Sequence, residues 1–178
     1  QNKPTPVDEA HSIIWFLENV FYQVIPQIQH KLPCQTTCIE LGFWPGGDRD
    51  GNPFVTAEVT LEVADKLRSS LLRCYYQDLQ SLRRRLTFAG ISELLTAIAL
   101  KIRHDSYLSS SQLITDLQQV SKKLSNQYHG LFVNLVQDLI KKINLFHFYF
   151  AKIDIRQNSS IHRQVVADIL RSTSLCPD

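Results

Sequence analysis

The amino-acid sequence predicts a mostly α-helical chain with two short β-strands that belong to an incomplete α/β (TIM-like) barrel. Apolar residues recur at helical spacing through most of the 178 residues, and two short β-compatible runs interrupt that pattern. Each run ends in a polar, arginine-bearing turn. Strands separated by a long helical stretch, with polar residues just past their carboxyl ends, resemble two consecutive strands of an α/β barrel. Two strands alone form no stable sheet in water, so we expect the other strands outside this sequence.

The amino-terminal part of the chain predicts a helix that follows a proline-containing loop. Asp8 and Glu9 suit its first turn, because the amino-terminal end of the helix dipole favours negative charge. Pro26 should kink or end this helix, since proline lacks the N–H that a helix interior needs. Helical spacing predicts an apolar face made of Ile13, Leu17, Val20, Val24 and Ile28.

A strand and a long helix are predicted next. The run CIELGFW, residues 38–44, is β-compatible and ends just before Gly46 and Gly47. Thr56 is the expected N-cap of the helix that follows, because its hydroxyl can accept a hydrogen bond from a first-turn N–H. Gly90 should break that helix. Its continuous apolar face is predicted to contain Ala64, Leu67, Leu71, Tyr75, Leu79, Leu82 and Leu86.

The second half of the chain predicts more helices and one strand. Helical patterns cover about 92–103, 111–125 and 130–146. The aromatic and β-branched run FHFYFAKIDIRQ, residues 146–157, predicts the second strand. Ser159 or Ser160 should cap a last helix, whose apolar positions are Ile161, Val165 and Ile169.

Composition and charge exclude several classes of protein. The formal charge of +2 is too small to indicate nucleic acid or a membrane surface as the main partner. No apolar run approaches the roughly 18–20 residues that span a bilayer, and no signal peptide opens the chain. The cysteines form no CxxC pair, so we expect a reduced, cytoplasmic compartment; they are Cys34, Cys38, Cys74 and Cys176.

The ends of the chain predict an internal piece of a longer protein. The sequence contains no Met, and it stops directly after a helical pattern. We therefore expect residues 1–178 to be a single internal segment with no domain boundary inside it.

The loop GGDRDGNP, residues 46–53, is the first candidate site. An EF-hand that began at Asp48 would need Gly at its sixth position and Glu at its twelfth, and finds Pro53 and Val59 there, so the loop does not fit the EF-hand pattern and the sequence argues against calcium. The two glycines allow close approach of the backbone to a ligand, and Arg49 could pair with phosphate or carboxylate. Taken alone, these residues favour a tight strand-to-helix turn in which Arg49 pairs with a neighbouring aspartate.

The second candidate site is the run KIDIRQNS. Asp154 and Arg156 alternate along the predicted strand, so both should point to one face and Ile153 and Ile155 to the other. Ionisable groups on a buried face are costly unless they are paired or bind something, so a ligand site and a structural ion pair remain open. The basic run 83–85 spreads around its helix and indicates a solvated surface. The histidines have no metal-ligand spacing: His11, His30, His104, His129, His147 and His162.

Several of these segments together resemble the phosphoenolpyruvate carboxylase family. The two long motifs are FWPGGDRDGNPFVT and KIDIRQNSSIH; KPTPVDE, LLRCYYQDLQSLRRRL and LFHFYFAKIDIRQ also occur in the expected order and spacing. The resemblance implies a large, mostly helical protein around an eight-stranded barrel, with its active site at the carboxyl ends of the strands. It also implies a cytoplasmic homo-oligomer, a tetramer in this family. The implied reaction joins bicarbonate to phosphoenolpyruvate with Mg²⁺ or Mn²⁺, giving oxaloacetate and phosphate.

The resemblance also implies roles for four residues. Arg156 matches the arginine of the DIRQ motif, which lies near the substrate phosphate and is the expected catalytic and substrate-binding residue. Trp44 matches a tryptophan that forms a wall of the pocket. Arg49 and Asp50 match the loop itself, where they either contact the substrate or order the barrel mouth. Elsewhere the sequence departs from the family, since Pro45 replaces a common methionine and His147 a usual glycine.

Other parts of the family's active site are absent from these 178 residues. The resemblance places a catalytic histidine motif upstream, and metal-binding carboxylates, a catalytic lysine and a mobile loop rich in glycine and arginine downstream. We therefore expect the full-length protein to be the enzyme and this segment alone to be inactive. The alternative is a non-catalytic helical regulatory or interaction module that retains the barrel motifs as scaffold.

Overall fold

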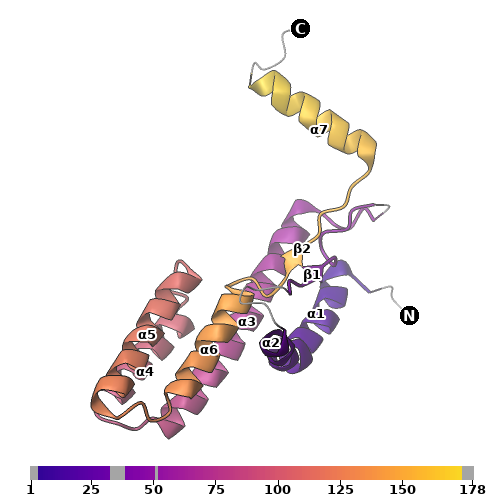
Figure 1. The fold of residues 1–178 in the computed structure, drawn as a ribbon. Coiled ribbons are helices and arrows are strands. Elements are labelled where there is room, and N and C mark those ends of the chain that lie inside the picture. Colours follow the sequence, from indigo (N-terminus) through magenta and orange to yellow (C-terminus); the bar gives the residue numbers. More distant parts are fainter. Residues whose placement is uncertain (1–3, 33–38, 51, 174–178) are drawn as a thin grey trace.

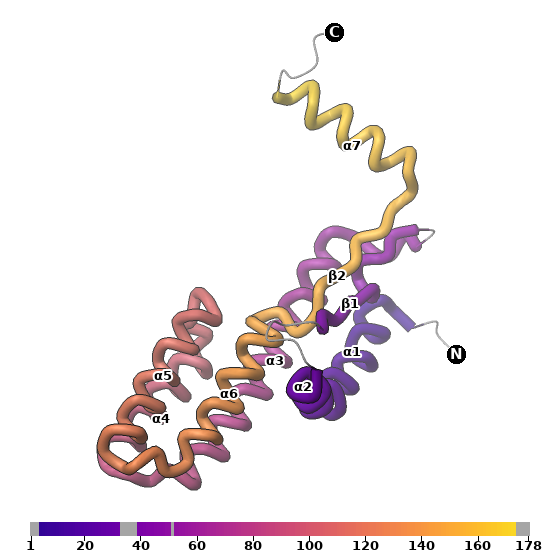
Figure 2. Tube along the Cα trace, in the orientation of Figure 1, coloured from indigo at the N-terminus to yellow at the C-terminus, as the bar shows by residue number. Residues whose placement is uncertain are grey.

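The computed structural model describes residues 4–32, 39–50 and 52–173, and in these ranges the chain is mostly helical with two short parallel strands (Figures 1 and 2). This confirms the predicted secondary-structure class. The amino-terminal elements are α1 (Pro6–Phe16), the π-helix η1 (Leu17–Phe21), α2 (Tyr22–Lys31) and β1 (Gly42–Phe43). The helices that follow are α3 (Ala57–Arg85), α4 (Ile91–Arg103), α5 (Ser110–Gln127) and α6 (Val133–Phe146). The chain continues with β2 (Lys152–Ile153) and α7 (Ser159–Ser172).

The long helix α3 is the central element of the fold. Helices α1, α4 and α6 contact it directly, and α5 packs between α4 and α6 (Figure 1). Thr56 is its N-cap, as predicted, and accepts a hydrogen bond from the Val59 N–H at 3.4 Å. The helix ends at Arg85, before Gly90, which has a φ of 71° and is the N-cap of α4. Most of the predicted apolar face is buried: Leu67, Leu71, Tyr75, Leu79, Leu82 and Leu86.

The predicted apolar face of the first helix is wrong beyond Leu17. Val20, Val24 and Ile28 are exposed, whereas Tyr22 and Ile25 are buried. The cause is η1, because each residue of a π-helix turns the chain through a smaller angle than in an α-helix, and the helical face that meets the core changes by about one position. The helix also continues past Pro26 to Lys31, so Pro26 does not end it.

Helix α7 extends away from the other helices (Figure 1). It buries none of its residues, and Ile161, Val165 and Ile169, its predicted apolar positions, are exposed. Its N-cap is Asn158, whose side chain accepts a hydrogen bond from the Ser160 N–H. The prediction that Ser159 or Ser160 is the cap is therefore wrong.

The two strands are parallel neighbours although more than a hundred residues separate them. Gly42 pairs with Lys152 and Phe43 with Ile153. Both strands are shorter than predicted, and Cys38, which belonged to the predicted first strand, lies outside the described residues. Since parallel strands run the same way, the segments that follow their carboxyl ends lie at one edge of the pair.

Candidate functional site

The GGDRDGNP loop and the DIRQ segment meet where the two strands end. The Arg156 N–H donates to the Gly47 carbonyl at 3.0 Å, and the Arg49 N–H donates to the Arg156 carbonyl at 2.9 Å. An isolated parallel bridge pairs Asp48 with Arg156. Main-chain hydrogen bonds therefore hold the two predicted site segments side by side.

Glycines are required in the loop because it passes close to two other segments. A Cβ on Gly47 would overlap the Asp154 carbonyl oxygen, which belongs to the DIRQ segment. Gly46 has a φ of 76°, and a Cβ there would lie 2.7 Å from Cγ2 of Val63 on α3. The loop is thus enclosed between the DIRQ segment and α3, and neither position has room for a side chain.

Arg156 is the more accessible of the two predicted site arginines. Its side chain is 63% exposed, and its Nη1 lies 3.9 Å from Oδ2 of Asp48. Asp48 was not predicted as a site residue, although it is part of the same motif. The predicted alternation of faces does not hold here, because β2 ends at Ile153 and Asp154, Ile155 and Arg156 are all exposed.

Arg49 is directed toward α3. Its Nη2 donates to the Thr60 hydroxyl at 3.0 Å, and its Nε is buried with no hydrogen-bond partner among the described residues. The predicted ion pair with a neighbouring aspartate is not among its contacts. Sequence reasoning missed Thr60, and the only signal for it was its position one helical turn after the N-cap Thr56.

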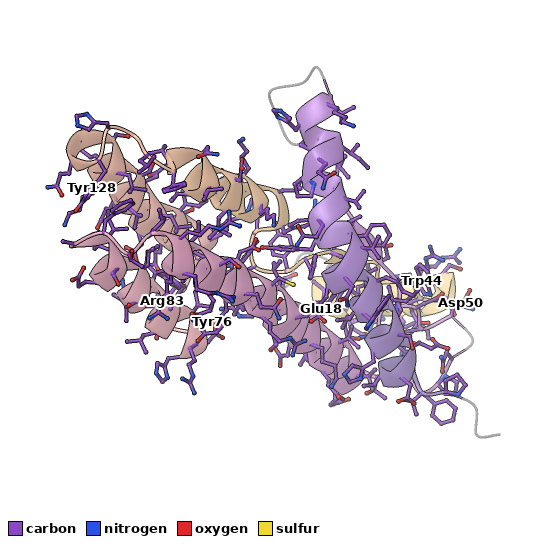
Figure 3. The ribbon with its side chains drawn as sticks, turned by 90° about the horizontal axis from the view of Figure 1, so that it is seen from below. Glu18, Trp44, Asp50, Tyr76, Arg83 and Tyr128 are labelled. Carbon is purple, nitrogen blue, oxygen red and sulfur yellow. The ribbon has the colours of Figure 1, made fainter. Side chains whose placement is uncertain are left out.

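Trp44 and Asp50 lie at the same end of the molecule (Figure 3). Trp44 is 53% exposed, and its main-chain carbonyl accepts from the N–H groups of Gly47 and Asp48 at 2.9 and 3.1 Å. Asp50 is exposed, and its N–H donates to Oδ1 of Asp48 at 3.3 Å. Trp44 and Asp50 are therefore both accessible, on the segment whose main chain is paired with Arg156.

The described residues do not form a metal site. Within the described ranges, no group of three or more His, Cys, Asp or Glu side chains could hold a metal ion. In the same ranges, every helix is too short or too polar to cross a membrane.

The comparisons with known proteins identify the family. A family model described as phosphoenolpyruvate carboxylase matches residues 1–105 and 91–178. The phosphoenolpyruvate carboxylase of Aeromonas salmonicida is 28% identical to this chain over 96% of its residues. That of Tolumonas auensis is 28% identical over 98% of the chain, and that of Shewanella loihica is 30% identical over 97%. The chain belongs to the phosphoenolpyruvate carboxylase family. It spans 25% of the length of each of these relatives.

The relatives have additional residues within the matched region. The alignment with the A. salmonicida protein runs over 216 positions, whereas this chain has 178 residues. The two matches to the family model overlap at 91–105, which covers α4. Helix α4 contributes five residues to the core: Ile91, Leu95, Ile98, Ala99 and Ile102.

Proposed function

We propose that this chain supplies part of the substrate pocket of a phosphoenolpyruvate carboxylase, which carboxylates phosphoenolpyruvate with bicarbonate to give oxaloacetate and phosphate. One observation carries the proposal: parallel strand pairing brings the GGDRDGNP loop and Arg156 together past the strands' carboxyl ends. In α/β barrels, active sites lie at that edge. The remaining strands of the barrel would come from the rest of a longer protein.

Arg156 is the proposed catalytic and substrate-binding residue. Its guanidinium is permanently charged, offers a planar fork of N–H donors and is exposed at the strand ends. It can therefore donate two parallel hydrogen bonds to a phosphate group and stabilise charge that moves between phosphate and enolate oxygens. Trp44 would form one wall of the pocket, with Arg49 and Asp50 in the adjacent loop.

The family's metal would be held outside this segment. The reaction is proposed to use Mg²⁺ or Mn²⁺, but the described residues include no group that fits such an ion. By the same resemblance we propose that the full-length protein is a cytoplasmic homo-oligomer.

The test compares the full-length protein that contains this chain with the isolated 178-residue segment. With Mg²⁺ or Mn²⁺ present, the full-length protein should form oxaloacetate from phosphoenolpyruvate only when bicarbonate is added. The isolated segment should form none, because the family resemblance places the catalytic histidine motif, the metal ligands and the mobile loop outside it. A coupled oxaloacetate assay measures both.

Two outcomes would contradict this proposal. Bicarbonate-dependent turnover by the isolated segment would refute the assignment of the histidine motif, the metal ligands and the mobile loop to other parts of the protein. A folded but inactive full-length protein that lacks the upstream histidine motif would favour the non-catalytic module.

A further inference from the structure

The hydroxyl of Thr60 connects the GGDRDGNP loop to the first turns of α3. Its Oγ1 lies 3.0 Å from Nη2 of Arg49, 2.6 Å from the Gly46 carbonyl oxygen and 3.0 Å from the Thr56 carbonyl oxygen. Thr60 itself is part-buried beneath the loop. One side chain thus contacts both the start of the loop and its central arginine.

The hydrogen-bond capacity of a hydroxyl decides which of these contacts form together. A threonine hydroxyl has one proton and two acceptor sites. Arginine can only donate, so Thr60 accepts from Arg49 and has one proton left for a carbonyl. The contact with the Gly46 carbonyl is the shorter of the two, so we assign the proton to that hydrogen bond. The Thr56 carbonyl is the alternative acceptor, because a threonine in a helix can donate to the carbonyl four residues earlier. Donation to Gly46 also makes the oxygen a better acceptor for Arg49.

These contacts distinguish the two arginines of the site. The Arg49 side chain turns inward, with its Nε buried and its Nη2 on α3, whereas the Arg156 side chain is 63% exposed. The Arg49 backbone N–H also donates to the Arg156 carbonyl. A displacement of Arg49 would therefore be passed to the backbone that carries Arg156.

We propose that Thr60 is a positioning residue, and that Arg49 serves the substrate site by holding the loop against α3 and Arg156 and not by touching the substrate. This inference rests on the proposed function and chooses between the two roles that the sequence left open for Arg49. A displacement of about 1 Å in a catalytic group can cost roughly 100-fold in rate, so a loosened loop should lower turnover.

The test uses Thr60→Val and Thr60→Ser in the full-length protein. Valine keeps the shape of threonine and removes the hydroxyl, whereas serine keeps the hydroxyl. Thr60→Val should lower kcat by about 10- to 100-fold with a smaller change in KM for phosphoenolpyruvate, and Thr60→Ser should stay within about threefold of the wild type. In an Arg49→Ala background, Thr60→Val should have a smaller effect than in the wild type, because the contact with Arg49 is already lost and only the contact with the Gly46 carbonyl remains to be removed.

Thr96→Val is the matched control. The Thr96 hydroxyl likewise accepts from an arginine, Arg83, at 3.1 Å and donates to the carbonyl of Ser92 four residues earlier. Figure 3 shows Arg83 far from Trp44 and Asp50. The control should leave kcat unchanged, and equal losses in the Thr60 and Thr96 variants would overturn the inference.

A second measurement separates this inference from the proposed function. Amide hydrogen exchange at Arg49, whose N–H is bonded to Arg156, should be at least about tenfold faster in Thr60→Val than in Thr96→Val, whether or not the protein is active. Unchanged exchange would overturn the positioning role even in an active enzyme. An inactive wild type with the expected exchange difference would contradict only the proposed function.

Discussion

The carbonyl oxygen of Asp154 lies where a side chain on Gly47 would have to be. The two residues belong to the two motifs by which this chain resembles its family, and they are more than a hundred positions apart. Their close approach allows Arg156 to donate its N–H to the Gly47 carbonyl, so the absence of a side chain at position 47 is a condition for the site to form.

Gly47→Ala should destabilise the protein and separate the two segments. The new methyl group would overlap main-chain atoms that cannot move independently, and overpacking of this kind costs about 1–3 kcal/mol. Urea unfolding measures the loss. Gly42→Ala is the control, because its Cβ would meet the Asp154 carboxylate at 3.0 Å, at the free end of a side chain. Equal stability of the two variants would contradict the close approach at Gly47.

Arg156→Lys should damage the full-length enzyme more than Arg49→Lys does. Lysine keeps the charge but loses the bidentate geometry, and a lost transition-state contact of this kind costs about 2–4 kcal/mol, or roughly 30- to 1,000-fold in kcat/KM. At Arg49, lysine can still donate to Thr60, so the effect should be smaller. Steady-state kinetics decide the matter.

Arg171→Lys is the control for both arginine variants. Like Arg156, Arg171 is an exposed arginine beside an aspartate, but it lies on α7. Near-normal kinetics for Arg156→Lys, comparable with those of the control, would remove Arg156 from the site.

His147→Gly should stabilise the protein. His147 follows α6 with φ 51° and ψ −119°, a backbone conformation that glycine adopts far more readily than other residues, and such strain costs on the order of 1 kcal/mol. The Tyr75 hydroxyl donates to the His147 carbonyl at 2.8 Å, a contact that any residue at 147 can keep. Thermal unfolding should show that glycine is more stable than alanine at this position, since both remove the ring. The reverse order would refute the strain.

The stability of the protein should fall with pH between about 9 and 12, partly through Cys74. Burial, with a smaller contribution from Glu18, raises the pKa of this thiol from its ordinary value of 9.0 to about 12. The unfolded chain therefore loses the Cys74 proton first, so the stability from this group is complete below pH 9 and is lost as the pH approaches 12. The slope of unfolding free energy against pH should be shallower in Cys74→Ala. The tyrosines titrate in the wild type and in the Cys74→Ala variant alike, so any difference between the two slopes comes from the thiol. Identical slopes would contradict burial of the thiol.

Helix positions followed from the sequence more closely than helix faces. Spacing and capping placed α3, α4 and α5 within a few residues, because their periods stay regular over many turns. The face of α2 was wrong, since one π-helical turn changes every later position and no single residue marks that turn. The strands were overestimated because the aromatic run before β2 begins as the end of α6 and then turns, with Phe150 at a φ of 55°.

The candidate site divides in the same way. The sequence placed Trp44, Asp50 and Arg156 at two strand ends, and parallel pairing brings their segments together. The direction of the Arg49 side chain did not follow, because the partner of a guanidinium depends on which helix passes beneath the loop. Helix α3 begins at Ala57, and the start of the helix fixes which residues of its first turns face the loop. Thr60 is one of these residues and therefore becomes the partner of Arg49.

The exposure of the indole rings makes the protein suitable for optical experiments. The chain has two tryptophans, Trp15 and Trp44, which are 56% and 53% exposed. Indoles in water emit at long wavelength, so folding alone should change the colour of the emission little. Replacing Trp15 with Phe leaves Trp44 as the single tryptophan, on the segment that is paired with the one carrying Arg156. Quenching or a blue shift on adding phosphoenolpyruvate would then report occupancy of the proposed site directly, without any coupled enzyme.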